Sequence, residues 1–459
     1  MKRTILLFTF LMFGISLQAQ SPAITSWLQN TTETGSYYTN GNPNVIENNI
    51  LVNCQKVEYS NDFVYVTATG IPAYPTGPFR DGNPSQATNQ EGIYQFPLNP
   101  QRETGTPSST TGGNIGLFIN GVALFDYRDG VGWNSTTNAL CGGPGNPPCG
   151  GGPGGPMTQT DWSRDAIPAE KAGFDCAKGH PAMGNYHHHQ NPSAFKLDIN
   201  VISDVCDIHD AEGLYVIDDT QHSPLIGFAY DGFPIYGAYG FKNTNGTGGI
   251  VRIKSSYHKR NITERTHAAN GEDVDDGPPI SDTYFLGYFR EDYEYIDHPD
   301  EDYLDEHNGR FCVTPEYSEG TYAYFATVDE DWNSAYPYVV GPTFYGVYER
   351  RDVDSVTEAT TVYTDPGTGI SEEAFNSLEV GVFPNPATDL IAIQIGGLVS
   401  EDLQVDLMDI TGRVVNSSKI KKGSTTAYFD VQTVYEGTYF IVISSNGYQT
   451  TQKVIVTKE

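Results

Sequence analysis

Basic residues are scarce in this chain of 459 residues: 26 Lys and Arg stand against 57 Asp and Glu, which gives a formal net charge of -31. Binding to nucleic acid or to an anionic membrane surface depends on Lys and Arg, so the composition excludes both as main partners. The acidic excess is instead typical of a protein kept soluble outside the cell, or of one that binds divalent cations through oxygen ligands.

Long helical periodicity is also scarce, and beyond the start of the chain no stretch is apolar enough to cross a membrane. Short β-branched and aromatic runs are common, and 49 Gly and 28 Pro supply many turns. Aromatic residues make up 12% of the chain, including 30 Tyr, which is incompatible with a disordered acidic polymer. The sequence therefore predicts a mostly-β protein.

The one extended apolar run lies at the start of the chain. Lys2 and Arg3 precede the apolar stretch 5–17, and Ala19 follows it. This is the order of a signal peptide, and the stretch is too short for a transmembrane helix. We expect residues 1–20 to be removed near Ala19 or Gln20, and the mature chain to have no transmembrane segment.

Cysteine is rare, with six residues and no Cys-x-x-Cys metal pattern. Cys141 and Cys149 flank a Gly- and Pro-rich loop that could close on itself. In an exported chain this spacing predicts a disulfide between them, whereas thiolate metal ligation has less support.

Composition changes mark the expected domains. Residues 21–352 contain no clear linker, whereas the polar composition of residues 353–378 predicts one. Residues 379–459 alternate short strands and turns, which predicts a small C-terminal β-sandwich. The strands expected there span 390–395, 404–409, 438–443 and 452–458.

The large domain contains an internal repeat. Residues 116–125 and 227–236 each consist of an apolar run, an Asn-Gly or Asp-Gly turn and a second apolar run. Residues 184–189 and 320–325 form a second matched pair, which aligns His187 with Ala323 and His189 with Phe325. The domain is thus predicted to hold two related halves, each a hairpin followed by a later strand.

Three consecutive histidines stand at 187–189. On a strand, His187 and His189 share one face, with Cα atoms roughly 6.5 Å apart. His180 and His222 lie in turns of the same domain. Two to four imidazoles suit copper or zinc, so these four residues are the metal-ligand candidates, while a purely structural role for the run stays open.

Other residues are weaker candidates for ligands. The further ligand candidates are Tyr186, Asp231, Asp305 and Glu306. Calcium could bind in the acidic stretches 291–306 and 272–277, although neither has EF-hand spacing, and solvated loops explain them as well. No nucleophile elbow, Walker loop, His-Glu-x-x-His or dinucleotide fingerprint is present, so no enzyme class is predicted.

Several motifs resemble the YHYH family. They are residues 179–181, 186–189, 225–237, 304–311 and 336–338. The resemblance covers most of residues 55–350, with His188 in place of the second Tyr of the family name. It names the domain but implies no particular biochemical activity.

The C-terminal segment resembles a type IX secretion sorting domain. The resemblance rests on residues 383–389, 409–415, 437–440 and 453–456. It implies that the type IX secretion machinery is a partner, that the tail is removed, and that the protein is released or attached at the outer-membrane surface.

These features predict a secreted or cell-surface protein that binds a metal ion or a small polar ligand through its histidines. Two alternatives remain at this point: a structural or adhesive surface module that binds glycans, and a metal-dependent oxidase or hydrolase.

Overall fold

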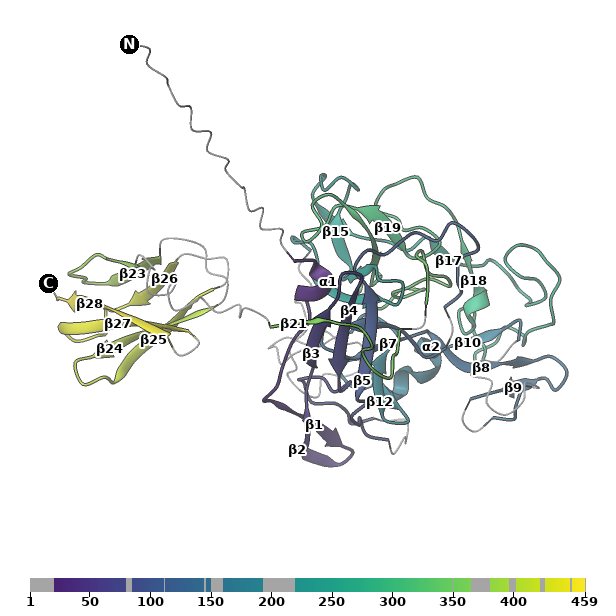
Figure 1. Ribbon diagram of the computed structural model, residues 1–459, viewed down its shortest axis with the longest axis horizontal. Coiled ribbons are helices and arrows are strands. Elements are labelled where there is room, and N and C mark those ends of the chain that lie inside the picture. The colour runs from purple at the N-terminus through teal and green to yellow at the C-terminus, as the bar shows by residue number, and fades with distance from the viewer. Residues whose placement is uncertain are drawn as a thin grey trace, which may run out of the picture. The chain divides into compact units, whose positions relative to one another are not determined.

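Strands dominate the computed structural model, and the predicted mostly-β class is confirmed (Figure 1). The chain divides into two compact units, Met1–Tyr363 and Thr364–Glu459. The expected signal peptide lies outside the described part of the chain. The structure describes residues 20–79, 85–110, 112–143, 146–149, 160–192, 219–349, 351–364, 380–395, 402–421, 426–445 and 448–458.

An eight-stranded sheet forms the centre of the first unit, in the order β11-β12-β7-β6-β13-β14-β20-β19. The two predicted hairpins, β6–β7 and β13–β14, lie at its middle, and Gly121 and Gly232 adopt positive φ in their turns. The strands are β6 (Asn114–Phe118), β7 (Ala123–Phe125), β11 (His180–Ala182), β12 (Asn185–His188), β13 (Leu225–Ala229), β14 (Pro234–Tyr236), β19 (Gly309–Cys312) and β20 (Thr321–Phe325).

The predicted duplication is confirmed by the register of this sheet. Each half is a hairpin, a strand parallel to its second arm, and an antiparallel edge strand. His188 pairs with Leu124 in the first half, and Tyr324 pairs with Ile235 at the matching position of the second. The hairpins meet through the antiparallel pair β6 and β13, so the strand order reads alike from both edges.

The edge strands extend the match beyond the repeat seen in the sequence. His180 lies opposite His187, and Arg310 lies opposite Ala323, which makes Arg310 the counterpart of His180. Five residues earlier, Asp175 accepts the Tyr186 hydroxyl at 2.9 and 3.0 Å, and its counterpart Asp305 accepts the Tyr322 hydroxyl at 2.8 and 3.0 Å.

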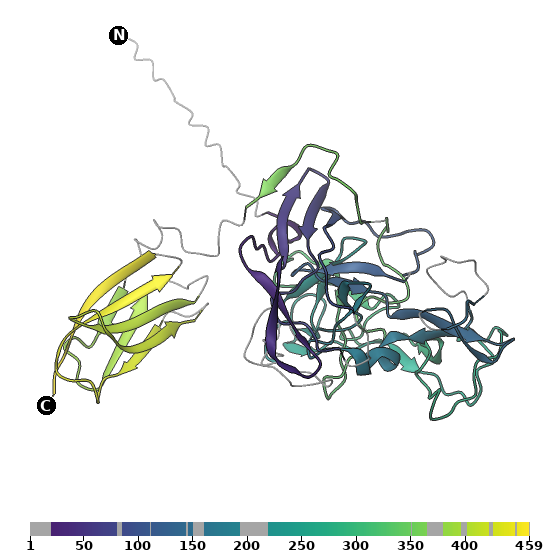
Figure 2. The same ribbon diagram turned by 90° about the horizontal axis from the view of Figure 1, so that it is seen from below.

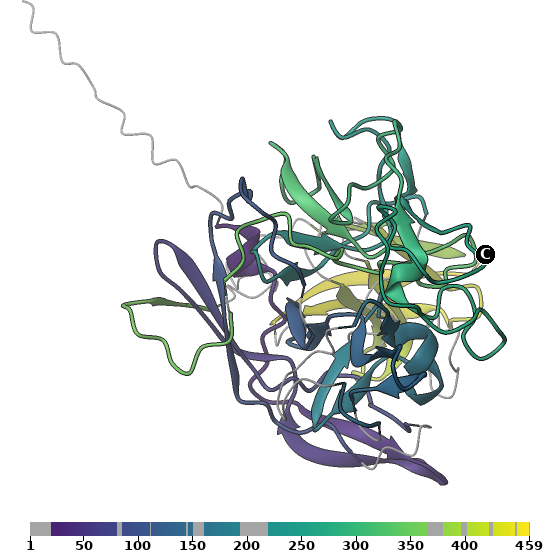
Figure 3. The same cartoon turned by 90° about the vertical axis from the view of Figure 1, so that its right-hand side faces the viewer.

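Smaller sheets and short helices surround the central sheet. Figures 1 and 2 show β8 and β9 on the opposite side of the unit from β3 and β4, and Figure 3 shows the β1–β2 hairpin reaching out at an edge. These strands are β1 (Thr34–Thr39), β2 (Asn42–Leu51), β3 (Cys54–Tyr59), β4 (Phe63–Ala68), β5 (Gly92–Pro97), β8 (Arg128–Asn134), β9 (Ala139–Cys141), β10 (Ser163–Asp165), β15 (Tyr239–Phe241), β16 (Ile250–Arg252), β17 (Tyr257–Lys259), β18 (Tyr293–Tyr295) and β21 (Thr361–Tyr363). The helices are α1 (Pro22–Thr25), α2 (Ala166–Glu170), η1 (Lys171–Gly173) and η2 (Arg290–Asp292).

The segment expected to be a linker begins within the first unit. β21 pairs antiparallel with β3 and joins the sheet β21-β3-β4-β5. The part of the expected linker at 365–378 lies outside the described residues.

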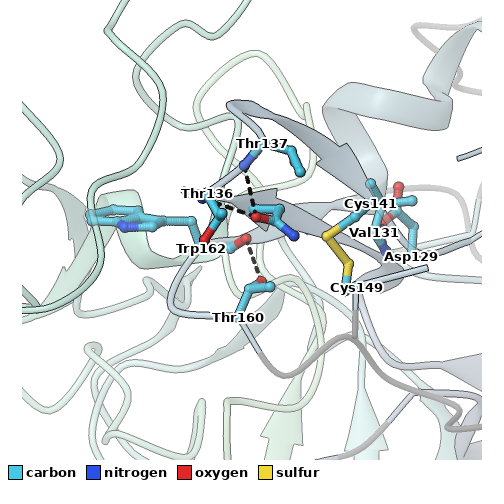
Figure 4. The surroundings of a disulfide bond; sticks show 9 residues. Asp129, Val131, Thr136, Thr137, Cys141, Cys149, Thr160 and Trp162 are labelled. Carbon is cyan, nitrogen blue, oxygen red and sulfur yellow. Dashed lines mark hydrogen bonds between the residues drawn. A yellow bond between two sulfur atoms is a disulfide. The ribbon is translucent and has the colours of Figure 1, made fainter. Parts of the chain in front are cut away.

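The predicted disulfide between Cys141 and Cys149 is present (Figure 4). Cys141 ends β9 and lies opposite Gly132 of β8, with Val131 and Asp129 close by. Cys176 is also disulfide-bonded, whereas Cys54 and Cys312 are free and buried.

The second unit is built from two sheets, β22-β23-β26 and β25-β24-β27-β28. They share one hydrophobic core that includes Ile391, Leu407 and Ile441. The four strands expected from the sequence all form. The strands are β22 (Val380–Phe383), β23 (Leu390–Ile395), β24 (Leu403–Asp409), β25 (Val414–Ile420), β26 (Thr426–Asp430), β27 (Gly437–Ser445) and β28 (Tyr448–Val456). Among the described residues of the chain, no helix is long and apolar enough to cross a membrane.

Candidate metal centre

Three of the four histidine candidates converge at the first-half edge of the central sheet, near α2. His180 comes from β11, His187 from β12, and His189 follows β12 directly. The Nε2 atoms of His187 and His189 are 3.0 Å apart, and those of His180 and His189 are 3.4 Å apart. One donor atom from each of the three histidines lies within 4.8 Å of those of the other two, and all three residues are buried.

The opposite ring nitrogens fix the tautomers of two of these histidines. His187 Nδ1 lies 2.9 Å from the carbonyl oxygen of Asn185, and His189 Nδ1 lies 2.6 Å from that of Asp126. A carbonyl only accepts, so each Nδ1 carries the proton and each neutral ring presents an Nε2 lone pair. The two Nε2 atoms face each other at 3.0 Å, a separation at which a proton or a metal cation can be shared between them.

The separations suit an ion held by several imidazoles. Zinc–nitrogen bonds of 2.0–2.1 Å place ligand nitrogens about 3.3 Å apart in tetrahedral geometry and about 2.9 Å apart at a right angle. The ring of Phe125 stacks on His187 with centroids 3.7 Å apart, which fixes the plane of that ligand. Backbone carbonyls and the Phe125 ring thus hold His187 and His189 at metal-ligand spacing.

A carboxylate stands beside the cluster. Glu170, the last residue of α2, places Oε2 3.2 Å from His180 Nε2 and 3.5 Å from His189 Nε2. Burial opposes a charge on His189, but the Glu170 carboxylate outweighs it and raises the pKa of His189. Burial and the neighbouring imidazoles lower the pKa of His187 well below its usual range, so that ring stays neutral.

The cluster opens into a cleft of about 480 Å³. The cleft is lined by Gln90, Gly112, Gly113, Phe125, Arg128, Asp129, Gly130, Glu170, His180, Ala182, Met183, Asn185, His187 and His189. Asp126 binds Arg128 in a two-point contact, and Asp129 pairs with Arg164. The charges on this wall are therefore internally paired, and an ion on the histidines would face a space large enough for a small ligand.

His188 points to the other side of the strand, as period-two alternation predicts. Its Nε2 lies 3.0 Å from the Tyr74 hydroxyl, and its Nδ1 lies 3.1 Å from the carbonyl of Lys178. Burial lowers the pKa of His188 to about 3. This histidine is part of the core and does not reach the cleft.

The expectation that His222 reaches the cluster is not met, because His222 lies in the second half of the domain. Its ring packs at 5.1 Å from Tyr236 and 6.2 Å from Phe325, the counterparts of Phe125 and His189. Its Nδ1 bonds the carbonyl of Ser223 at 2.7 Å. The second half thus has Arg310, Ala323 and Phe325 where the first half has His180, His187 and His189.

Arg310 occupies the position that matches His180. Its guanidinium donates to the backbone oxygens of Phe241, Lys242 and Glu301, and it lies 5.3 Å from the centroid of Phe325. A fixed cation in the chain therefore stands at the matching edge of the second half.

The further ligand candidates from the sequence have other partners. Tyr186 donates to Asp175, Asp305 accepts from Tyr322, and Asp231 accepts from Tyr324 at 2.6 Å. The side chain of Glu306 is largely exposed, 3.8 Å from His307. None of these four belongs to the histidine group.

In the acidic stretch 291–306, the side chains of Asp292, Asp302 and Glu291 bind other groups of the protein. Asp292 is buried with Arg265, at 2.7 Å, and Asp302 binds Lys254 at 2.9 Å. Glu291 accepts the backbone N–H of Ser163 at 2.6 Å.

Sequence reasoning missed Glu170, Asp126 and Phe125, because no motif connects them with the histidines. It also missed Asp175 and named Asp305 only as a ligand candidate, although a signal for their shared role existed: each lies four residues before a glycine, Gly179 and Gly309, at a spacing that the repeat shares.

Comparisons with known protein families agree with this architecture. A family model described as "YHYH protein" matches residues 93–337, more than half of the chain. A second, described as "Secretion system C-terminal sorting domain", matches residues 381–457. A search of curated proteins finds no match. The chain therefore belongs to the YHYH protein family and carries a type IX sorting tail that directs it to the cell surface or the medium.

Proposed function

We propose that this secreted YHYH protein binds one divalent transition-metal ion, copper or zinc, through His180, His187 and His189. The observation that carries the proposal is the convergence of three buried Nε2 atoms, two of them with tautomers fixed by backbone carbonyls. Their Nε2 atoms lie at the spacing of imidazoles that share one ion, which supports a bound cation.

Comparison of the two halves distinguishes the histidine cluster from the structural features that both halves share. Both halves keep the Asp–Tyr contact, a positive-φ residue before the glycine (Lys178 and Asn308), and the same strand order. Only the first half has the histidines, so the fold forms without them. This supports a binding role for the cluster over a structural one.

The test is the metal content of the mature protein. We expect one ion per chain after loading with zinc and dialysis, and loss of that ion in the double variant His187→Ala/His189→Ala. The matched control is His258→Ala/His267→Ala, which removes two exposed histidines elsewhere. Equal metal content in the two double variants, both folded, would refute the proposal.

A further inference from the structure

In the part of the chain that the structure describes, Glu170 is the one carboxylate that contacts two of the three histidines. The short helix α2 carries it. That helix is anchored at its start by Asp165, which caps the N–H of Ile167 at 2.9 Å and accepts the Tyr338 hydroxyl at 2.7 Å. Glu170 is therefore held over the cluster by buried contacts at the other end of its helix.

The Glu170 carboxylate lacks a hydrogen-bond partner for the oxygen that faces the cluster. Oε2 is buried, and its contacts with His180 and His189 do not have hydrogen-bond geometry within the described structure. The Glu170 oxygen and the Nε2 atoms of His180 and His189 thus lie within 3.5 Å of one another in one small volume, and the cost of burying them falls if a cation lies between them.

The other carboxylate of the cleft is not available in the same way. Asp129 is paired with Arg164 and accepts the N–H of Val131 at 2.9 Å. Asp126 is likewise committed to Arg128. Glu170 is therefore the acid whose oxygen remains free for an ion.

We infer that Glu170 is a ligand of the metal, which makes the site a set of three imidazole nitrogens and one carboxylate oxygen. This inference rests on the proposed metal-binding function. The mixed set favours a divalent ion such as Zn²⁺ or Cu²⁺, because Cu⁺ prefers thiolate and thioether ligands. The carboxylate also removes one of the two charges of the ion, so the occupied centre carries a net charge of about +1 if the rings are neutral.

The experiment uses the mature protein with substoichiometric metal. Zn²⁺ affinity is measured by competition with a chromophoric chelator, and the Cu²⁺ form is examined by electron paramagnetic resonance. Glu170→Gln removes the charged donor, Glu170→His replaces it with a nitrogen donor, and Glu264→Gln is the control at an exposed glutamate.

We expect Glu170→Gln to weaken Zn²⁺ binding by at least the roughly 10- to 100-fold that even an outer-shell partner contributes, and to change the Cu²⁺ spectrum. Glu170→His should bind more tightly than Glu170→Gln and show an added nitrogen donor. Glu264→Gln should match the wild type in both measurements.

Two results would overturn the inference while leaving the proposed function intact. One is a wild-type ion whose affinity and spectrum survive Glu170→Gln unchanged. The other is a weakened affinity with an unchanged spectrum in both variants, which would show that Glu170 acts through its charge alone. A wild-type protein that binds no ion would instead remove the proposed function and this inference together.

Discussion

The two halves of the YHYH domain provide a matched pair of substitutions, Tyr186→Phe and Tyr322→Phe. Each removes one buried hydroxyl that donates to an aspartate of the framework, Asp175 or Asp305. Each keeps the aromatic ring and its packing. The contacts have nearly the same lengths, so the two substitutions should destabilise the first unit by similar amounts.

The expected loss in the free energy of unfolding depends on the hydrogen bonds that each aspartate keeps. Asp175 keeps three backbone N–H donors, from Gly77, Ala177 and Gly179. Burial raises the pKa of Asp175 to about 7, so at pH 8 the lost bond is one to a carboxylate. Such a bond contributes roughly 1.5–3 kcal/mol, and we expect a loss of that size in the free energy of unfolding for each variant.

Tryptophan fluorescence during urea unfolding is the assay. The four tryptophans, Trp27, Trp133, Trp162 and Trp332, all lie in the first unit, so their emission does not report on the tail. Metal content should stay at the wild-type level in both variants. A change below about 0.5 kcal/mol in either variant would contradict the framework role, because surface substitutions already reach that size. Loss of metal only in Tyr186→Phe would assign Tyr186 to the site.

Four further predictions test other parts of the account. His188→Gln should make the free energy of unfolding less dependent on pH. In the wild type, His188 has a pKa near 6.5 in the unfolded chain and of about 3 in the folded one. The free energy of unfolding therefore falls by about 1.4 kcal/mol for each pH unit between 6.5 and 3. Urea midpoints at pH 7, 6 and 5 measure this, and parallel profiles would contradict it. Metal release should occur on acidification, because protons compete for the ring nitrogens, beginning with His189, whose pKa is raised. Equilibrium dialysis over a series of pH values measures the bound ion, and a metal content that does not fall with the pH would contradict the histidine site. Cys141→Ser/Cys149→Ser should lower the free energy of unfolding by about 2–3 kcal/mol, since the disulfide closes a short loop with a sequence separation of 8, and an unchanged urea midpoint would argue against that constraint. Deletion of residues 380–459 should retain the protein inside the outer membrane, whereas normal amounts of the truncated form in the medium would refute the role of the tail.

The sequence predicted features that depend on local periodicity. Alternation along a strand placed His187 and His189 on one face and His188 on the other, and the Asn-Gly and Asp-Gly pairs located both hairpin turns. The duplication followed from matching these same short segments.

Features that depend on long-range packing escaped prediction. His222 precedes the second hairpin along the chain, and that hairpin carries it to the second half, where Tyr236 and Phe325 surround it. Glu170 is brought to the cluster by a helix of five residues, which is too short to show a periodicity. The register that makes Arg310 the counterpart of His180 emerges only from the strand pairing.

The central claim is that an ion lies among His180, His187 and His189. Anomalous diffraction at the zinc absorption edge, from crystals of the zinc-loaded mature protein, tests it most directly. We expect one strong anomalous peak per chain, about 2.0–2.1 Å from the three Nε2 atoms. A loaded crystal with no peak there, or with its peaks only at the acidic loops, would contradict the claim.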